Sequence, residues 1–327
     1  MKRAVSWTIG LVVFAVAAAA AFLVLKKAAA ATPSSIKVEM TAERLQRGKY
    51  IFEYQADCIG CHSSRDFNRF AGWPKPEGIG AGFEFPKEVG LPGRVVAPNI
   101  TPDKETGIGE WTDGEKLRPI REGVSRDGRA LFPFMPYQHF AKLSDEDAYS
   151  VVAYLNTLKP VKSSLPKTEL DFPVNLMVKF APKPLSGPVA GPDRGDKVKY
   201  GEYLVGIGSC AECHSKQERG EIVKGMELAG GVEFNIPPYM VRTPNLTPEP
   251  ESGLGKWSEE KFLAKFRGYA NMTYENAPPN NQATFTIMPW YSFSQLTDED
   301  LKAIYAYLRT VKPVYNPVEV HPPVAQP

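Results

Sequence analysis

Two short segments of this 327-residue chain share the pattern Cys-x-x-Cys-His, and together they contain all of its cysteines. This pattern is the attachment signature of a c-type haem, in which both thiols bond to the macrocycle and the histidine ligates the iron. On a helical turn, residues three and four apart share a face, so the two sulfurs and the imidazole can point at one ring. The sequence therefore predicts two covalently bound haems c, held by Cys58, Cys61, His62, Cys210, Cys213 and His214.

Two other uses of paired cysteines compete with this interpretation. Four thiolates can form one zinc site, but the histidine after each pair would then be a coincidence. A thioredoxin-like redox motif needs a βαβ context, which neither flank offers. If haem uses all four thiols, none is left for a disulfide, so haem and packing must stabilise the fold.

The second axial ligand of each iron decides the chemistry. Met135 follows His62 by 73 residues and Met288 follows His214 by 74, and each methionine precedes a proline and an aromatic residue. Methionine is usually a core filler, but this repeated context favours Met135 and Met288 as ligands.

The two remaining histidines lack this repeated context. The position that matches His139 in the second half is a serine, and His321 lies in the tail. We expect both to be surface or packing residues. Histidine and methionine together fill both axial positions and raise the reduction potential. The sequence therefore predicts single-electron transfer rather than binding of oxygen or peroxide.

The chain repeats itself at about 150 residues, a period typical of duplicated domains rather than of a solenoid. The shared order is helix, haem motif, long loop, methionine and terminal helix. The first helix is expected to begin near Thr41, and Gly48 and Gly201 would let the first and last helices of each half cross closely. The matching runs are 47–50 and 200–203, 97–102 and 243–248, 107–112 and 253–258, 134–137 and 287–290, and 145–161 and 298–314.

The last helix of each half is expected to begin at Ser144 or Thr297, each an N-cap followed by acidic residues. Prolines 160 and 313 would end these helices. Apolar residues at helical spacing then form one core-facing stripe in each helix. Asn99 and Asn245, with Trp111 and Trp257, suit either contacts to haem propionates or turn and packing roles.

The predicted fold class is all-α: two tandem cytochrome c-type domains with long loops, and with short hairpins near 82–86 and 231–235, after an N-terminal transmembrane helix. Six prolines in the linker indicate a stiff, extended strap. The predicted divisions are 1–31 as membrane anchor or signal segment, 40–160 as domain 1, 161–195 as linker, 196–315 as domain 2 and 316–327 as tail.

The N-terminal segment has 21 uncharged residues, 5–25, between Lys2–Arg3 and Lys26–Lys27. A helix of this length can cross a bilayer, and the basic residues before it place the N-terminus inside. A cleaved signal peptide is the alternative, because Ala28–Ala31 offers small residues for cleavage. Both alternatives export the rest of the chain. The net charge of the chain is only +2, so the sequence gives no sign of the strongly basic surface that binds nucleic acid.

The chain resembles two class I cytochrome c domains over residues 40–160 and 196–315. The runs Pro-Asn-Ile-Thr-Pro-Asp and Gly-Ile-Gly-Glu-Trp, followed by Met-Pro-Tyr, are similar to those of membrane-bound cytochrome c subunits of bacterial alcohol, aldehyde and gluconate dehydrogenases. The resemblance implies a quinoprotein or flavoprotein donor and ubiquinone or an oxidase as acceptor. That family typically has three haems and a C-terminal anchor, so the resemblance leaves the partner open.

These site features favour one class of function over two others. The leading one is a membrane-tethered periplasmic dihaem cytochrome of a respiratory chain, which carries single electrons between a dehydrogenase or quinol-side donor and a terminal oxidase or other acceptor. Its partners would be redox proteins (a dehydrogenase subunit, an oxidase or another cytochrome), and it would have no catalytic activity of its own. A dihaem peroxidase needs an iron that can open a position, which paired methionines argue against. A thiosulfate dehydrogenase needs a free cysteine ligand, and a gas sensor needs an output domain; the sequence offers neither.

Overall fold

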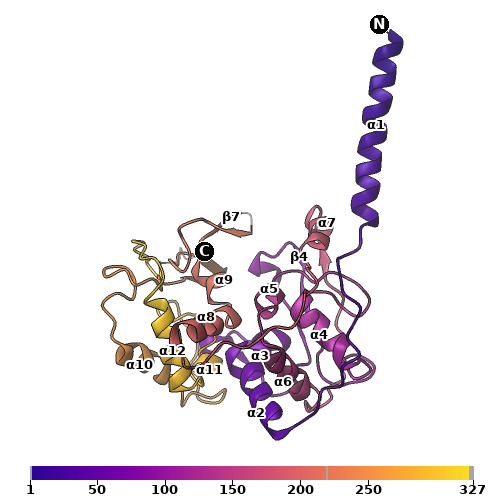
Figure 1. Cartoon of the computed structure of the whole chain (residues 1–327). Helices are drawn as coiled ribbons and strands as arrows, with labels where there is room; N and C mark the ends of the chain where they lie inside the picture. Colours follow the sequence, from indigo (N-terminus) through magenta and orange to yellow (C-terminus); the bar gives the residue numbers. More distant parts are fainter. Residues whose placement is uncertain (1, 219, 324–327) are drawn as a thin grey trace.

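The computed structural model describes residues 2–218 and 220–323. Two similar helical halves lie side by side, and a long N-terminal helix, α1 (Lys2–Leu25), stands away from them (Figure 1). The expected two tandem domains are confirmed, and their regular structure is mostly helical, with short strands in the loops.

The expected transmembrane helix falls on α1, and the side chains of several of its residues lie outside the described set. Within the described residues, none of the helices combines the length and apolar character that a membrane span requires.

The helices follow the same order in both halves. In the second half, α12 (Asp298–Leu308) crosses α8 (Lys197–Ile207), just as α6 (Asp145–Leu155) crosses α2 (Ala42–Tyr50) in the first. The first half contains α2 (Ala42–Tyr50), the π-helix η1 (Ile51–Gln55), α3 (Cys58–His62), α4 (Asp113–Glu122), α5 (Tyr137–Phe140) and α6 (Asp145–Leu155). The second contains α8 (Lys197–Ile207), α9 (Cys210–His214), α10 (Glu259–Arg267), α11 (Trp290–Phe293) and α12 (Asp298–Leu308).

Three of the expected N-caps are confirmed. The side-chain oxygens of Thr41, Ser144 and Thr297 accept hydrogen bonds from backbone N–H groups three residues later, at 3.3, 3.0 and 3.2 Å. The expectation that the last helices extend up to prolines 160 and 313 is wrong. Helices α6 and α12 end at Leu155 and Leu308, before either proline is reached.

Glycine allows the first and last helices of each half to touch. A Cβ atom at Gly48 would collide with the carbonyl oxygen of Ser150 in α6, and one at Gly201 would collide with that of Ala303 in α12. The close crossing that the sequence suggested is thus confirmed. It fixes the first helix of each half, which precedes the haem motif, relative to the terminal helix.

The strands are short and form antiparallel pairs. Of the two expected hairpins, the second is present as consecutive strands, whereas the first pairs across a longer loop. The pairs are β1 (Arg65–Asp66) with β2 (Trp73–Pro74), β3 (Phe83–Glu84) with β5 (Val96–Ala97), β4 (Gly93–Arg94) with β6 (Glu169–Leu170), β7 (Gln217–Glu218) with β8 (Glu221–Ile222), and β9 (Glu233–Ile236) with β10 (Tyr239–Arg242).

The linker contains regular structure, whereas its prolines had indicated a fully extended strap. Strand β6 in the linker pairs with β4 of the first half. Helix α7 (Val174–Met177) and the 3₁₀ turn η4 (Val178–Phe180) follow it, close to the end of α1 (Figure 1). The proline count alone did not indicate this compact turn.

Candidate haem sites

The first haem motif forms the short helix α3, directly after the π-helix η1. Asp57 precedes it with φ +47°, a left-handed conformation that turns the chain sharply between the two helices. His62 is buried, and its Nδ1 atom lies 2.8 Å from the carbonyl oxygen of Pro98. Because that carbonyl can only accept, Nδ1 carries the proton and Nε2 is left to ligate iron.

The second motif repeats this geometry in α9. Ser209 takes the left-handed position with φ +51°, and the Nδ1 atom of buried His214 lies 2.9 Å from the carbonyl oxygen of Pro244. Pro98 and Pro244 occupy matching positions in the repeated loops. Both imidazoles are therefore oriented by the same backbone device, as expected for two iron ligands of one type.

Burial sets the charge of these groups. It lowers the pKa of His62 and of His214, and the proline carbonyls only partly oppose the shift, so both rings are neutral near pH 7. Burial also raises the pKa of the Cys61 thiol to about 12 and that of Cys213 to about 11. Apolar surroundings of this kind suit thioethers and a macrocycle better than free thiolates.

The zinc alternative finds no support here. Among residues 2–218 and 220–323, no three histidine, cysteine or acidic side chains gather into a metal site. The cysteines form no disulfide. Each half instead offers two thiols and one oriented neutral imidazole, the donor set that a covalently attached haem needs.

The loop asparagines have a structural role. Asn99 accepts hydrogen bonds from the Thr101 N–H and hydroxyl groups at 3.0 and 2.7 Å, and its amide donates to the carbonyl oxygen of Val161 at 2.8 Å. Asn245 does the same with Thr247 and Val314 in the second half. Of the two roles left open by the sequence, the structure assigns both amides to the turn. They tie the loop beside each haem histidine to the segment after the last helix.

The candidate methionines lie in matching places. Met135 packs against the first-half cluster that includes Phe140 and Leu143, and Met288 packs against the second-half cluster around Leu301. Each directly precedes the proline that begins a one-turn helix, α5 or α11.

The other two histidines have protein partners. The Nε2 atom of His139 lies 2.6 Å from a carboxylate oxygen of Glu212, and that of His321 lies 2.9 Å from the carbonyl oxygen of Phe285. Both contacts agree with the packing roles expected for these residues.

The two halves are joined by a reciprocal pair of tyrosines, which the sequence did not reveal. The Tyr203 hydroxyl donates to Asp147 of the first half at 2.6 Å and accepts from the Ser144 N–H at 3.1 Å. In the same way, the Tyr50 hydroxyl donates to Asp300 of the second half at 2.6 Å and accepts from the N–H of the N-cap residue Thr297 at 3.0 Å.

Each of these carboxylates also has a partner in its own half. Arg47 binds Asp147 through two 2.7 Å hydrogen bonds, while Tyr200 donates to Asp300 at 2.9 Å. Burial raises the pKa of Asp147, but the hydrogen bonds and charge of Arg47 outweigh it and leave the pKa below its usual value. Asp147 is therefore charged at neutral pH and ties both halves together.

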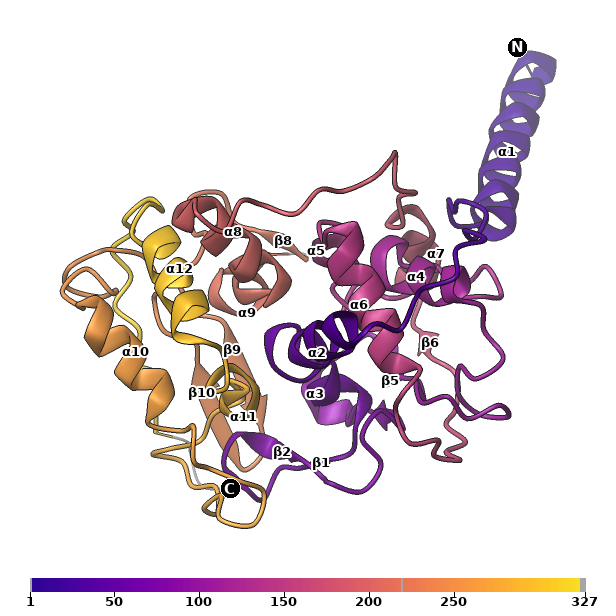
Figure 2. The same cartoon turned by 60° about the horizontal axis from the view of Figure 1, so that its bottom comes forward.

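Next to this tie, each one-turn helix after a candidate methionine touches the haem motif of the other half. In α11, the Ser292 hydroxyl donates to Asp57, directly before the first motif, at 2.6 Å. In α5, His139 contacts Glu212, which lies inside the second motif. The interface thus places α3 and α9 on facing sides of the two halves (Figure 2).

Aromatic packing extends the interface. Tyr291 of α11 packs in one buried cluster with Phe70 and Ala71 of the first half, and its ring lies 5.4 Å from that of Trp73. Asn280 donates to the carbonyl oxygens of Phe67 and Arg69, both at 2.7 Å. Polar and apolar contacts together therefore hold one relative orientation of the two halves.

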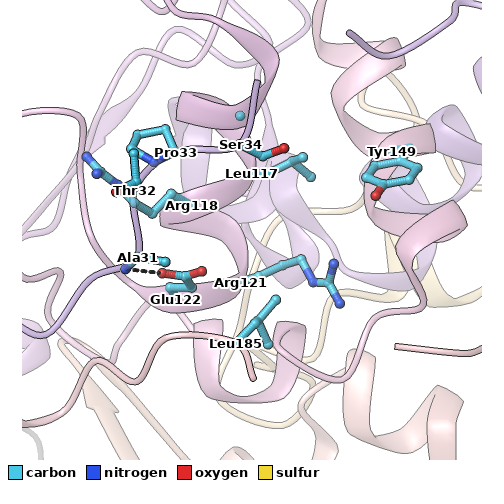
Figure 3. Close-up of a pocket in the computed structure, with 11 residues that line it drawn as sticks. Ala31, Thr32, Pro33, Ser34, Leu117, Arg118, Arg121, Glu122, Tyr149 and Leu185 are labelled. Atoms are coloured by element: carbon cyan, nitrogen blue, oxygen red, sulfur yellow. Dashed lines mark hydrogen bonds between the residues drawn. The ribbon is translucent and has the colours of Figure 1, made fainter. Parts of the chain in front are cut away.

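A separate cavity lies between the N-terminal segment and α4 (Figure 3). The backbone N–H of Ala31 donates to Glu122 at 3.2 Å, while Arg121 is bound by Asp145 and by the Leu143 carbonyl oxygen. None of the predicted haem-binding residues lines this cavity. Its described contacts attach the N-terminal segment to the first half.

Comparison with known proteins agrees with this geometry. The family model of cytochrome c matches residues 45–159 and again residues 198–312. The chain belongs to the cytochrome c family.

Three relatives illustrate its similarity to other proteins. The fructose dehydrogenase cytochrome subunit of Gluconobacter japonicus is 31% identical over 82% of this chain and 52% of its own length. The alcohol dehydrogenase (quinone) cytochrome c subunit of Gluconacetobacter polyoxogenes is 29% identical over 83% and 56%. A diheme cytochrome c-type protein of Cereibacter sphaeroides is 30% identical over 81% and 85%.

These findings confirm several expectations. Two cytochrome c domains, with a diheme relative, establish two covalently bound haems c as the cofactors. The relatives are named as cytochrome subunits, which agrees with an electron-transfer rather than a catalytic role. The chain spans only about half the length of the dehydrogenase subunits that it matches.

We predict that Tyr203→Phe lowers the free energy of unfolding by about 1.5–3 kcal/mol, because the charged Asp147 loses a hydrogen bond. Urea unfolding measures this change, and Tyr315→Phe on an exposed ring is the matched control. The contribution is fully present above the unfolded-state pKa of 3.8 and is lost as the pH falls through the lower folded-state value. Equal effects of the two substitutions at neutral pH would contradict the tie.

Proposed function

We propose that this protein is a periplasmic dihaem cytochrome c that carries single electrons from a dehydrogenase to a terminal oxidase or another acceptor of a respiratory chain. When bound, the haem irons accept and release one electron at a time. The proposal is supported by the relatives named as cytochrome subunits of fructose, alcohol and gluconate dehydrogenases. Its redox partners would dock through small transient interfaces.

One structural observation carries this proposal: each haem motif lies against the other half. Asp57 directly precedes the first motif, and Glu212 is one of the two variable residues inside the second. Each contacts a side chain of the opposite half at 2.6 Å. This arrangement would hold the two haem-binding motifs next to each other, as electron exchange between the bound haems would require. A chain built only to hold two independent haems would not need this facing arrangement.

We further propose Met135 and Met288 as the second axial ligands, opposite His62 and His214. Their support is the matched position before α5 and α11, together with the protein partners of His139 and His321. With both axial positions filled, the iron undergoes little rearrangement on changing its charge, as electron transfer requires.

We also propose that residues 5–25 tether the protein to the inner membrane, with domain 1 (40–160), the linker (161–195) and domain 2 (196–315) in the periplasm. The support is the run of 21 uncharged residues between basic ones. The described side chains of α1 agree with a lipid environment, since Trp7, Phe14 and Leu25 are exposed. A mature N-terminus near Thr32 would instead identify a cleaved signal peptide.

Purification of the full chain from gently solubilised native membranes tests the function. We expect a dehydrogenase to co-purify, and its substrate to reduce both haems of the complex. The reduction is followed by the visible haem spectrum. A preparation in which no dehydrogenase accompanies the chain, and in which dehydrogenase substrates leave the haems oxidised, would contradict the proposed donor.

We predict that Met135→Ala removes about half of the methionine-to-iron charge-transfer absorbance and lowers the potential of one haem only, because ferrous iron loses its soft thioether ligand. Met288→Ala should do the same at the other haem. Spectroscopy and redox titration measure both effects, with His321→Ala as the control. If His139→Ala produced a high-spin haem while Met135→Ala changed nothing, the first haem would have two histidine ligands.

A further inference from the structure

The linker carries a group of exposed apolar side chains. Phe172, just before α7, is 79% exposed, and Met177 in α7 and Phe180 in η4 are 63% and 49% exposed. None of the three belongs to the described buried clusters of either half. Three large apolar side chains within nine residues of a solvent-facing linker indicate a surface that something else covers. We call residues 172–180 the linker turn.

The linker turn is fastened to the end of α1. The Lys179 ammonium group donates to the carbonyl oxygens of Leu23 and Val24 at 3.3 and 2.8 Å. These carbonyls lie in the last turn of α1, where a helix lacks its own hydrogen-bond donors. The ammonium group of Lys26 also lies 4.8 Å from the centre of the Phe180 ring. Figures 1 and 2 both place α7 beside the base of α1.

The composition around this junction indicates which kind of partner covers it. Apolar and aromatic side chains of the linker turn continue the apolar surface of α1, where Phe22 and Leu25 are exposed. Lys26 and Lys179 contact this junction, and Lys27 and Lys183 lie close to it in the sequence. Aromatic rings mixed with lysines are typical of segments that lie at the boundary between lipid headgroups and acyl chains.

We propose that the linker turn rests in the headgroup region of the lipid bilayer, as a second membrane contact beside α1. Phe172, Met177 and Phe180 enter the boundary layer, and the lysines bind anionic headgroups. This inference rests on the proposed membrane tether. Because β6, directly before the linker turn, pairs with β4 of the first half, the turn would hold that domain at a set height and orientation above the membrane.

Thiol labelling in lipid nanodiscs tests this contact. The native cysteines are bonded to haem, so Met177→Cys in the full chain provides one reactive thiol. Tyr315→Cys is the matched control, because the two native side chains are 63% and 65% exposed. Nanodiscs of phosphatidylethanolamine and phosphatidylglycerol leave both faces open to a charged, water-soluble maleimide. Rates are normalised to those of the same variants in urea.

We expect Met177→Cys to react at least about tenfold more slowly than Tyr315→Cys in nanodiscs, and at a similar rate in lipid-free amphipathic polymer. Equal rates in nanodiscs would overturn the lipid contact and leave the tether standing. Failure of the chain to co-purify with nanodiscs would overturn both. Slow labelling in the polymer would also overturn the proposal, because the turn would then be covered in the absence of lipid.

Discussion

Two buried carboxylates with two tyrosine hydroxyls hold the halves of this molecule in one orientation. Asp147 and Asp300 each lie in the first turn of the last helix of their half, and each accepts a 2.6 Å hydrogen bond from a tyrosine of the opposite half. The same hydroxyls accept from the N–H of the helix N-cap, so each satisfies two groups at once. A buried carboxylate is tolerated only when its oxygens are hydrogen-bonded, which makes the orientation specific. The placement of both haem motifs depends on it.

The tie is nearly symmetric, but the surroundings of the two motifs are not. Asp57 precedes the first motif and accepts from the Ser292 hydroxyl, whereas Glu212 lies inside the second and contacts His139. Reduction potentials respond to charge and hydrogen bonding near the iron. The two halves therefore share one repeated scaffold. The residues that differ between them at the interface give the two haems different surroundings.

Much of this could be predicted from the sequence because local patterns determine it. The haem motifs, the N-caps at Ser144 and Thr297, and the tight crossings at Gly48 and Gly201 all depend on short segments. The docking of the halves could not be predicted in this way. Tyr50 and Tyr203 stand in matching repeats, and a repeat gives no sign of whether each tyrosine bonds within its own half or across to the other. The linker turn was missed for a related reason, since its prolines indicated an extended strap.

Intramolecular electron equilibration is the most direct test of the central claim that the two haems face each other within one chain. A brief radiolytic pulse that reduces a small fraction of the haems, followed by time-resolved spectroscopy, reports how the electron redistributes. The facing arrangement predicts redistribution at a rate independent of protein concentration. A rate that rises in proportion to protein concentration would mean that electrons move only between molecules, and would contradict it.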